Sequence, residues 1–267
     1  MPAKSPSPVT IPDFARWKAE GRKISVLTAY DFTMGQLLDA AGVDCLLVGD
    51  SLGLVVQGRP TTLGVTLDQM VYHAEMVARA TTRALVVADL PFGSYQVSPA
   101  QAIVSATRFL KETTCQAVKL EGGRRMSATI RALVEADIPV MGHVGLTPQS
   151  VRRLGGFKVQ RDASEIVDDA KAVAEAGAFA LVLECVPAEV AARVTAEVPI
   201  PTIGIGAGPG CDGQVLVTPD LLGLFEGFRP KFVRRYVELG EPIRQAARAY
   251  VADVQAGRFP NDIESFH

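Results

Sequence analysis

The stretch ALVVADLPFGSYQVSPAQAIVSATRFLKETTCQAVKLE, residues 84–121, carries the pattern that decides the fold. It begins and ends with short apolar runs, 84–88 and 117–120, each typical of a strand that is covered on both faces. Between them, Ser98-Pro99-Ala100-Gln101 has the residues of a helix capping box, with proline at the first helical position. A strand, a helix and a second strand in this order predict one βα unit of a parallel sheet.

The same alternation continues in both directions along the chain. Thr66-Leu67-Asp68-Gln69 is a second capping box, and a further helix is expected to begin at Asp162 and to stop at Gly177. Eight apolar runs predict strands, at Ile24–Ala29, Cys45–Gly49, Ala84–Ala88, Ala117–Leu120, Ile138–Gly142, Phe179–Leu183, Ile200–Ile205 and Gln214–Val217. Eight parallel strands fit either an open doubly wound sheet or a closed (β/α)8 TIM barrel.

The position of the glycines separates these two folds. An open sheet would usually carry a Gly-rich phosphate turn directly after its first strand, where this chain has Thr28-Ala29-Tyr30-Asp31-Phe32. The Gly-rich segment 204–210 comes late and lacks the third glycine of G-x-G-x-x-G. We therefore predict a closed TIM barrel, in which segment 204–210 is either a tight turn or a place where backbone approaches a ligand or a neighbouring loop.

At 267 residues, the chain has the usual length of one such barrel, so we predict a single domain over residues 1–267, with 1–10 flexible. Ile11–Gly21 is expected to form an N-terminal helix that caps the barrel floor. Asp220–Phe228 and Lys231–Ala256 are expected to be extra C-terminal helices.

Composition narrows the possible partners. The net charge is -2 and no basic cluster is interleaved with aromatic residues, so nucleic acid is not expected to bind. No apolar run approaches ~18 residues and no signal-peptide core is present, so a cytoplasmic protein without a membrane partner is expected. The four cysteines form no C-x-x-C pair, which favours free thiols in a reducing compartment.

Polar residues follow five of the predicted strands directly: Asp50, Asp89, Glu121, His143 and Glu184. In a TIM barrel these strand ends meet at one rim, where active sites of this fold are built. Taken singly, a carboxylate at such a place is more often a helix cap than a ligand. Three carboxylates on consecutive strands would repel one another unless a cation neutralises them, and oxygen ligands without Cys or His favour Mg²⁺.

The remaining rim residues have two interpretations each. Glu184 is either another loop carboxylate or a base that removes a proton next to the carbonyl of a metal-bound 2-oxo acid. Lys119 is either a solvated residue or a buried cation that neutralises the charge of the substrate. His143 is either a satisfied core histidine or a hydrogen-bond donor to substrate, whereas His73 lies within a helix pattern and is expected to be structural.

Six motifs together resemble the ketopantoate hydroxymethyltransferase family, from about Ile24 to Asp220. They are Leu27-Thr28-Ala29-Tyr30-Asp31, Val48-Gly49-Asp50-Ser51-Leu52-Gly53, Ala88-Asp89-Leu90-Pro91-Phe92-Gly93-Ser94-Tyr95, Val118-Lys119-Leu120-Glu121-Gly122-Gly123, Gly142-His143-Val144-Gly145-Leu146-Thr147-Pro148-Gln149 and Gly204-Ile205-Gly206-Ala207-Gly208. Their order and length make the resemblance specific.

The resemblance implies a reaction and a set of roles. The family transfers a hydroxymethyl group from 5,10-methylenetetrahydrofolate to 3-methyl-2-oxobutanoate through a Mg²⁺-stabilised enolate, giving 2-dehydropantoate for pantothenate and coenzyme A synthesis. The implied proton acceptor is Glu184, in Leu183-Glu184-Cys185-Val186-Pro187. The implied magnesium ligands are Asp50, Asp89 and Glu121. The implied contacts to the 2-oxo acid are Asp50, Ser51, Asp89 and Lys119.

The resemblance also implies a homo-oligomer, typically a decamer built as a pentamer of dimers. One departure is visible: where the family usually has Lys-Val-Gln-Gly, this chain has Lys158-Val159-Gln160-Arg161, which affects the expected loop conformation and not the catalytic residues. Two rival classes are a phosphoenolpyruvate mutase or isocitrate-lyase-like enzyme and a catalytically inactive binding barrel. The first would need a reactive cysteine on a flexible loop, for which Cys211 is the nearest candidate, and the second would have lost rim carboxylates that are present here.

Overall fold

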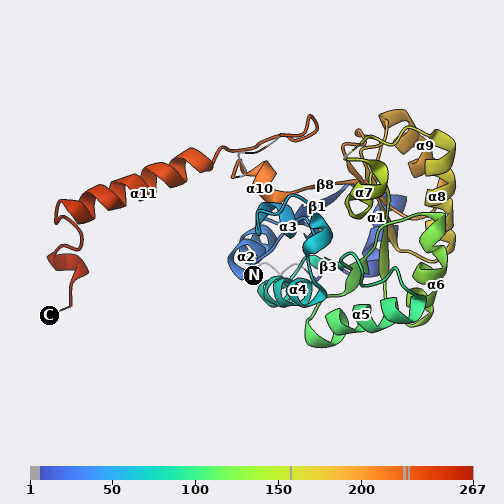
Figure 1. The fold of residues 1–267 in the computed structure, drawn as a ribbon, viewed down its shortest axis with the longest axis horizontal. Helices are drawn as coiled ribbons and strands as arrows, with labels where there is room; N and C mark the ends of the chain where they lie inside the picture. Colours follow the sequence, from blue (N-terminus) through green and yellow to red (C-terminus); the bar gives the residue numbers. More distant parts are fainter. Residues whose placement is uncertain (1–6, 157, 225–226, 228, 267) are drawn as a thin grey trace, which may run out of the picture. The chain divides into compact units, whose positions relative to one another are not determined.

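The computed structural model describes residues 7–156, 158–224, 227 and 229–266 (Figure 1). The chain divides into two compact units, one up to Val217 and the other from Thr218 onward. The first unit contains all eight strands and every predicted site residue.

The first unit is a closed barrel of eight parallel strands in the order of the sequence. The barrel closes because β1 pairs with β2 on one side and with β8 on the other. This confirms the predicted TIM barrel, and each strand begins and ends within two or three residues of the predicted run. The strands are β1 Ile24–Thr28, β2 Cys45–Val48, β3 Leu85–Asp89, β4 Ala117–Lys119, β5 Val140–Gly145, β6 Ala180–Glu184, β7 Thr202–Ile205 and β8 Gly213–Leu216.

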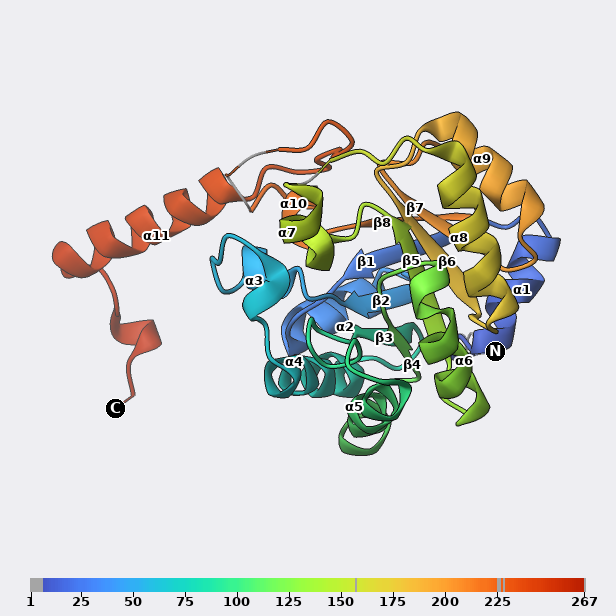
Figure 2. The same cartoon turned by 45° about the vertical axis from the view of Figure 1, so that its right-hand side comes forward.

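Helices surround the strands, and α4, α5, α6, α8 and α9 follow one another around the outside of the barrel (Figures 1 and 2). The described residues 206–212, which connect β7 to β8, contain no helix. Their glycines and Pro209 do not favour one. The helices of this unit are α1 Ile11–Ala19, α2 Phe32–Ala40, α3 Leu52–Val55, α4 Leu67–Ala80, α5 Pro99–Glu112, α6 Ser127–Glu135, α7 Val151–Leu154, α8 Ala163–Glu175 and α9 Ala188–Glu197, with short 3₁₀ turns at Thr62–Gly64, Arg124–Met126 and Pro148–Ser150.

Local signals fix the starts of these helices. At α4, Thr66 and Gln69 form the complete capping box that the sequence predicts. At α5, Ser98 caps the helix and Pro99 opens it as predicted, but the box is incomplete because the Gln101 side chain accepts from the main-chain N–H of Val97. α8 begins after its predicted cap, Asp162.

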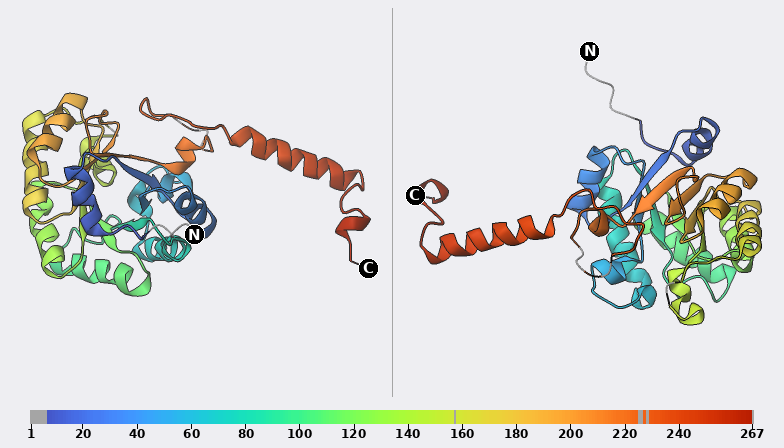
Figure 3. Two further views of the ribbon diagram at one scale, coloured as in Figure 1. Left: turned by 180° about the vertical axis from the view of Figure 1, so that it is seen from behind. Right: turned by 90° about the horizontal axis from the view of Figure 1, so that it is seen from above.

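α1 covers the amino-terminal ends of the strands. The rings of Phe14 and Phe179 lie 5.4 Å apart, edge to face, and Phe179 directly precedes β6. Lys18 Nζ lies 2.7 Å from Oδ2 of Asp212, the residue before β8. The left panel of Figure 3 shows α1, in dark blue, beside the strands. The prediction that this segment caps the barrel floor is confirmed.

The second unit contains the short helix α10, Thr218–Leu221, the long helix α11, Gly240–Gln255, and a 3₁₀ turn at Asp262–Glu264. The prediction of a helix over Lys231–Ala256 is wrong for its first part. Pro242 lacks a main-chain N–H and is tolerated only in a first turn, so α11 begins at Gly240. The predicted helix Asp220–Phe228 lies partly outside the described residues, and its described part ends at Leu221, before Gly223 with φ 63°.

None of the described helices has both the length and the apolar character needed to cross a bilayer.

Candidate active site

Strand pairing brings the predicted residues to one rim of the barrel. Asp89 and Lys119 are paired residues at the ends of β3 and β4, and Glu184 is the last residue of β6. Asp50 and Glu121 each follow a strand by two residues. Since all strands are parallel, these side chains share the carboxyl-terminal rim, as the sequence predicts.

The exact placement differs from the prediction for three residues. Asp89 and Glu184 are the last residues of their strands, and His143 lies inside β5. Main-chain pairing continues into these polar positions, where Asp89 pairs with Lys119 and His143 pairs with Val182. The strands therefore extend beyond their apolar runs, because pairing depends on the main chain and not on the side chain.

A buried ion pair occupies the rim between β3 and β4. Lys119 Nζ lies 2.9 Å from Oδ1 of Asp89, and each side chain is only 5% exposed. The other carboxylate oxygen of Asp89 accepts a hydrogen bond from the main-chain N–H of Asp50 at 3.0 Å. Although burial opposes it, the surrounding carboxylates of Asp89, Glu121 and Asp50 raise the pKa of Lys119. Lys119 is therefore a buried ammonium group paired with a carboxylate and not a solvated surface residue.

Gln149 links the carboxylates, although the sequence analysis assigned it no role. Its side-chain amide donates to Oδ2 of Asp50 at 2.9 Å, and its main-chain N–H donates to Oε2 of Glu121 at 3.0 Å. Its side-chain oxygen accepts from the hydroxyl of Tyr95 at 2.7 Å. Gln149 does not ionise, so the reasoning from charge missed it. Its only signal in the sequence was its place at the end of a family motif.

The single ammonium group of Lys119 only partly compensates the three buried carboxylates of the rim. Burial and the neighbouring Asp89 raise the pKa of Asp50 to about 7. Burial and the neighbouring Asp50 raise the pKa of Glu121 well above its usual range. In the part of the chain that the structure describes, no three His, Cys, Asp or Glu side chains are grouped as ligands of one metal ion. The three-carboxylate magnesium site therefore stays a prediction.

His143 connects the ion pair to Glu184. Its Nδ1 lies 3.3 Å from Nζ of Lys119, and its Nε2 lies 3.2 Å from Oε2 of Glu184. The second contact is close enough for an ion pair but lacks the geometry of a regular hydrogen bond. Burial and the Lys119 ammonium lower the pKa of His143. A neutral ring that accepts at Nδ1 from Lys119 carries its proton on Nε2, facing Glu184.

Ser51 lies beside this cluster, just before α3. Its hydroxyl is 2.8 Å from the hydroxyl of Tyr30, a buried residue of the first family motif. His73, on α4, places Nδ1 2.6 Å from the main-chain oxygen of Tyr30, which agrees with a structural role.

The two loops singled out by the sequence are packed against neighbouring elements. In the Gly-rich loop, Gly208 has φ 78°, and a Cβ there would lie 2.5 Å from Cβ of Ala188 at the start of α9. The positive φ fits a tight turn, and the short distance shows that the backbone of this loop also approaches a neighbouring element closely. In the loop of the family departure, Gln160 donates from its main-chain N–H to the oxygen of Cys185 at 3.2 Å, while Arg161 is exposed.

All four cysteines are free thiols, as predicted. Cys211 is buried and its burial raises the pKa of its thiol, so it lacks the exposure of a reactive loop cysteine. This removes the feature on which the mutase or lyase interpretation depended.

Comparison with known proteins finds relatives over nearly the whole chain. A sequence model of the ketopantoate hydroxymethyltransferase family matches residues 8–262. A protein of Cereibacter sphaeroides named 3-methyl-2-oxobutanoate hydroxymethyltransferase is 58% identical, covering 97% of this chain and 95% of its own length. A protein of Trichlorobacter lovleyi with the same name is 56% identical, covering 97% of this chain and 98% of its own length.

Solved structures show the fold alone. A phosphonopyruvate hydrolase in complex with oxalate and Mg²⁺ has a TM-score of 0.63 at 12% identity, covering 96% of this chain and 93% of its own. A 2,3-dimethylmalate lyase of the PEP mutase/isocitrate lyase superfamily has a TM-score of 0.61 at 19% identity, covering 98% and 90%. With a family match over nearly its whole length and relatives above half identity, the chain belongs to the ketopantoate hydroxymethyltransferase family.

Proposed function

We propose that this chain transfers a hydroxymethyl group from 5,10-methylenetetrahydrofolate to 3-methyl-2-oxobutanoate, giving 2-dehydropantoate in pantothenate and coenzyme A synthesis. The names of the relatives support the acceptor and the transferred group. The observation that carries the mechanism is the contact between Nε2 of His143 and Oε2 of Glu184, at 3.2 Å. Through this contact, the partly exposed carboxylate of Glu184 meets the buried groups of His143 and Lys119.

The donors of the rim fit a magnesium ion. Asp50, Asp89 and Glu121 offer only oxygen atoms, which hard cations prefer. Burial and mutual repulsion raise the pKa of Asp50 and of Glu121 even with Lys119 beside them, and a divalent cation would favour their charged forms. We propose that these three residues hold Mg²⁺, some of them through water. When bound, Mg²⁺ polarises the carbonyl of the 2-oxo acid and so acidifies the neighbouring C3–H bond.

Two polar groups beside the three carboxylates can bind the carboxylate end of the substrate. The buried ammonium group of Lys119 is available to neutralise a substrate carboxylate, and the hydroxyl of Ser51 can donate to one of its oxygens. The amide of Gln149 holds Asp50 in place. A small, negatively charged 2-oxo acid is therefore the ligand that these groups recognise.

Glu184 is the proposed proton acceptor. Its side chain is 17% exposed, more than Asp89 or His143, so substrate can reach it. It takes the C3 proton onto a carboxylate oxygen, while the neutral ring of His143 orients that carboxylate through Nε2–H. The other ring nitrogen, Nδ1, accepts from Lys119. A tautomer with its proton on Nδ1 would lose that contact, so the proton stays on Nε2, facing Glu184.

The remaining steps balance with one molecule of water. The enolate left after proton loss forms its new bond with the one-carbon unit of the folate. Both bonds from that carbon to the folate nitrogens break, and the nitrogens take up the C3 proton and one proton of water. The hydroxyl group of the same water becomes the hydroxyl of the product.

The test is folate-dependent turnover with a panel of 2-oxo acids, together with deuterium exchange at C3 of 3-methyl-2-oxobutanoate in D₂O. The proposal expects both activities, with 3-methyl-2-oxobutanoate preferred. Exchange without turnover would keep the enolate chemistry and reject the folate donor. Loss of both would reject the proposed function.

We also propose a cytoplasmic homo-oligomer, a decamer built as a pentamer of dimers, without nucleic-acid or membrane partners. Exposed apolar side chains on three barrel helices, Leu37, Tyr72 and Val104, support self-association because such residues are costly in water. Mass measurement of the native assembly tests it, and a monomer at micromolar concentration would contradict it.

A further inference from the structure

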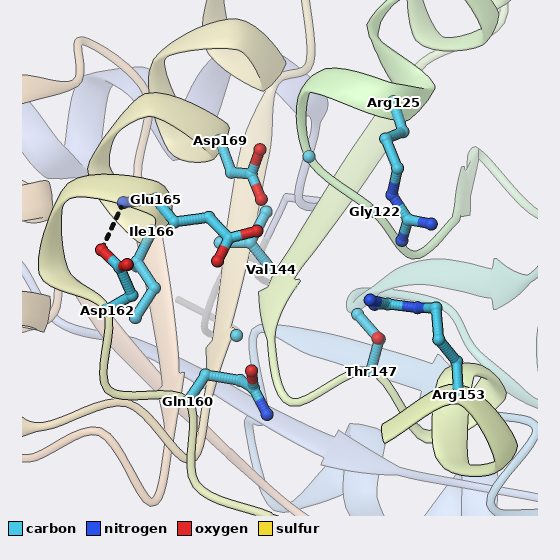
Figure 4. Close-up of a pocket in the computed structure, with 12 residues that line it drawn as sticks. Gly122, Arg125, Val144, Thr147, Arg153, Gln160, Asp162, Glu165, Ile166 and Asp169 are labelled. Carbon is cyan, nitrogen blue, oxygen red and sulfur yellow. Dashed lines mark hydrogen bonds between the residues drawn. The ribbon is translucent and has the colours of Figure 1, made fainter. Parts of the chain in front are cut away.

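A cavity lies at the same rim, between the ends of β4 and β5 and the start of α8 (Figure 4). Its volume is about 200 Å³. Gly122 and Val144, which line it, directly follow Glu121 and His143. Gly145, also in its lining, is the pairing partner of Glu184. The cavity therefore borders the candidate active site, although none of the residues proposed for catalysis lines it.

The cavity has two walls of opposite charge. In Figure 4 the side chains of Arg125 and Arg153 point toward the same part of it, while Asp162, Glu165 and Asp169 from α8 and its cap form the other wall. Two guanidinium groups that point toward the same place favour a ligand atom that accepts hydrogen bonds. A polyanion such as a phosphate would be repelled by the carboxylates opposite.

In the described ranges of the chain, three charged side chains of this cavity are free to bind a ligand, whereas two others already have partners in the protein. Among the described residues, neither guanidinium group, of Arg125 or of Arg153, has a hydrogen bond or an ion pair. Asp169 already accepts from the main-chain N–H of Arg124 at 2.9 Å, and Asp162 caps α8 by accepting from the main-chain N–H of Glu165 at 3.0 Å. Within the part of the chain that the structure describes, the Glu165 carboxylate has no hydrogen-bond or ion-pair partner, so it is free to accept from a ligand.

A flat ring with a donor edge and an acceptor oxygen matches these walls. The 2-amino-4-oxo ring of a pterin has an N–H and an NH₂ group side by side, which a carboxylate accepts in a bidentate manner. Its 4-oxo oxygen lies next to that edge and accepts from a guanidinium group. A cavity of about 200 Å³ is small among ligand pockets, so it suits such a ring and not a whole folate.

We propose that this cavity binds the pterin ring of the folate cosubstrate, with Glu165 accepting from the amino edge and Arg153 donating to the 4-oxo oxygen. The inference rests on the proposed function, and it deepens that function by assigning the folate site. Since the one-carbon unit is attached next to the pterin ring, a cavity that borders Glu184 and His143 brings that unit close to C3 of the 2-oxo acid. The rest of the folate then extends out of the cavity.

Calorimetric titration of the full chain with 6,7-dimethyltetrahydropterin and with tetrahydrofolate tests this assignment. Glu165→Gln is expected to weaken both ligands by about ten-fold or more, because it removes a charge-assisted bidentate contact. Glu175→Gln, on an exposed residue of the same helix outside the cavity, is the matched control and should change neither Kd. Arg153→Met should weaken both ligands, whereas Arg152→Met, its exposed neighbour outside the cavity, should not.

Two results would overturn the assignment: an unchanged Kd for tetrahydrofolate in Glu165→Gln, or wild-type binding of 4-aminobenzoylglutamate that Arg153→Met weakens while the pterin Kd stays the same. The second result would place the opposite end of the folate here. Turnover by the wild-type chain separates this inference from the proposed function. Absence of folate-dependent turnover contradicts the function, whereas turnover with a Glu165-independent Kd contradicts only the pterin site.

Discussion

The side-chain amide of Gln149 donates a 2.9 Å hydrogen bond to Oδ2 of Asp50, a residue 99 positions earlier in the chain. The main-chain N–H of the same residue donates to Glu121. One buried, uncharged residue thus fixes two of the three carboxylates predicted to hold magnesium. Its contribution should therefore appear both in the free energy of unfolding and in metal affinity.

Gln149→Leu is expected to lower the free energy of unfolding by about 1–3 kcal/mol, because Asp50 and the main-chain oxygen of Leu90 lose their donor inside the protein. It should also weaken Mg²⁺ binding. Denaturant unfolding and metal titration measure the two effects. Gln36→Leu, at an exposed position of α2, is the control, and equal behaviour of the two variants would show that Gln149 does not position the carboxylates.

Glu184→Gln should retain 3-methyl-2-oxobutanoate binding and lose C3 deuterium exchange by roughly 10²–10⁴-fold, since the amide cannot take the proton. Proton NMR in D₂O follows the exchange. Glu189→Gln, in the first turn of α9, is a control at a nearby carboxylate outside the cluster. Exchange at the wild-type rate would remove Glu184 from the role of base.

Removal of divalent cations with EDTA should reduce C3 exchange by about 10²-fold or more, and added Mg²⁺ should restore it. The physical reason is that a carbonyl without a bound cation acidifies its neighbouring C–H far less. Ca²⁺ at the same concentration is a useful comparison, because it prefers more and longer oxygen contacts. Full exchange in EDTA would show that the rim carboxylates act without a metal.

The stability of the metal-free chain should fall as pH rises through neutrality. Burial and Asp89 raise the pKa of Asp50 from 3.8 to about 7, so between these values the folded chain holds a proton that the unfolded chain releases. The contribution of Asp50 then decreases with pH up to about 7 and levels off above it, and Glu121, whose pKa is raised well above its usual range, acts in the same direction. The lowered pKa of His143 acts in the opposite direction, but only below its ordinary value of 6.5.

Thermal unfolding in EDTA between about pH 6.5 and pH 8, compared between the wild type and Asp50→Asn, separates the contribution of Asp50 from that of Glu121. We expect Tm to fall across this window, and Asp50→Asn to make the fall smaller. Asp68→Asn, at a side chain that is 82% exposed, should keep the slope of the wild type. A rising Tm, or the same slope in both variants, would contradict a protonated Asp50 in the folded chain.

Cys185, which follows the proposed base, has φ 48°, a left-handed conformation that favours glycine. Cys185→Val should lower the free energy of unfolding by about 1–2 kcal/mol because a β-branched side chain is strained there. Cys185→Gly should be neutral or stabilising in the same denaturation experiment. The opposite order of the two variants would mean that packing of the side chain outweighs backbone strain.

The strands were predictable because each is buried on both faces and so forms an almost continuous apolar run. The start of α4 was predictable because a capping box acts within four residues. Two other helix starts differ from the prediction, each for a local reason. The capping box at Ser98 is incomplete because the Gln101 side chain accepts from Val97 instead. Helix α11 begins late because Pro242 is tolerated only in the first turn of a helix, although the residues around it have a helical pattern.

The sequence by itself determined the closed barrel, the family and the rim on which the charged residues meet, since the order of strands and polar strand ends is written in the chain. Only the tertiary structure decided how those residues are connected: Gln149 between Asp50 and Glu121, and His143 between Lys119 and Glu184. These partners lie 24 to 99 residues apart, and a hydrogen bond depends on a few tenths of an ångström and on angle. No pattern of residue types along a chain specifies such a geometry before the strands have closed into a barrel.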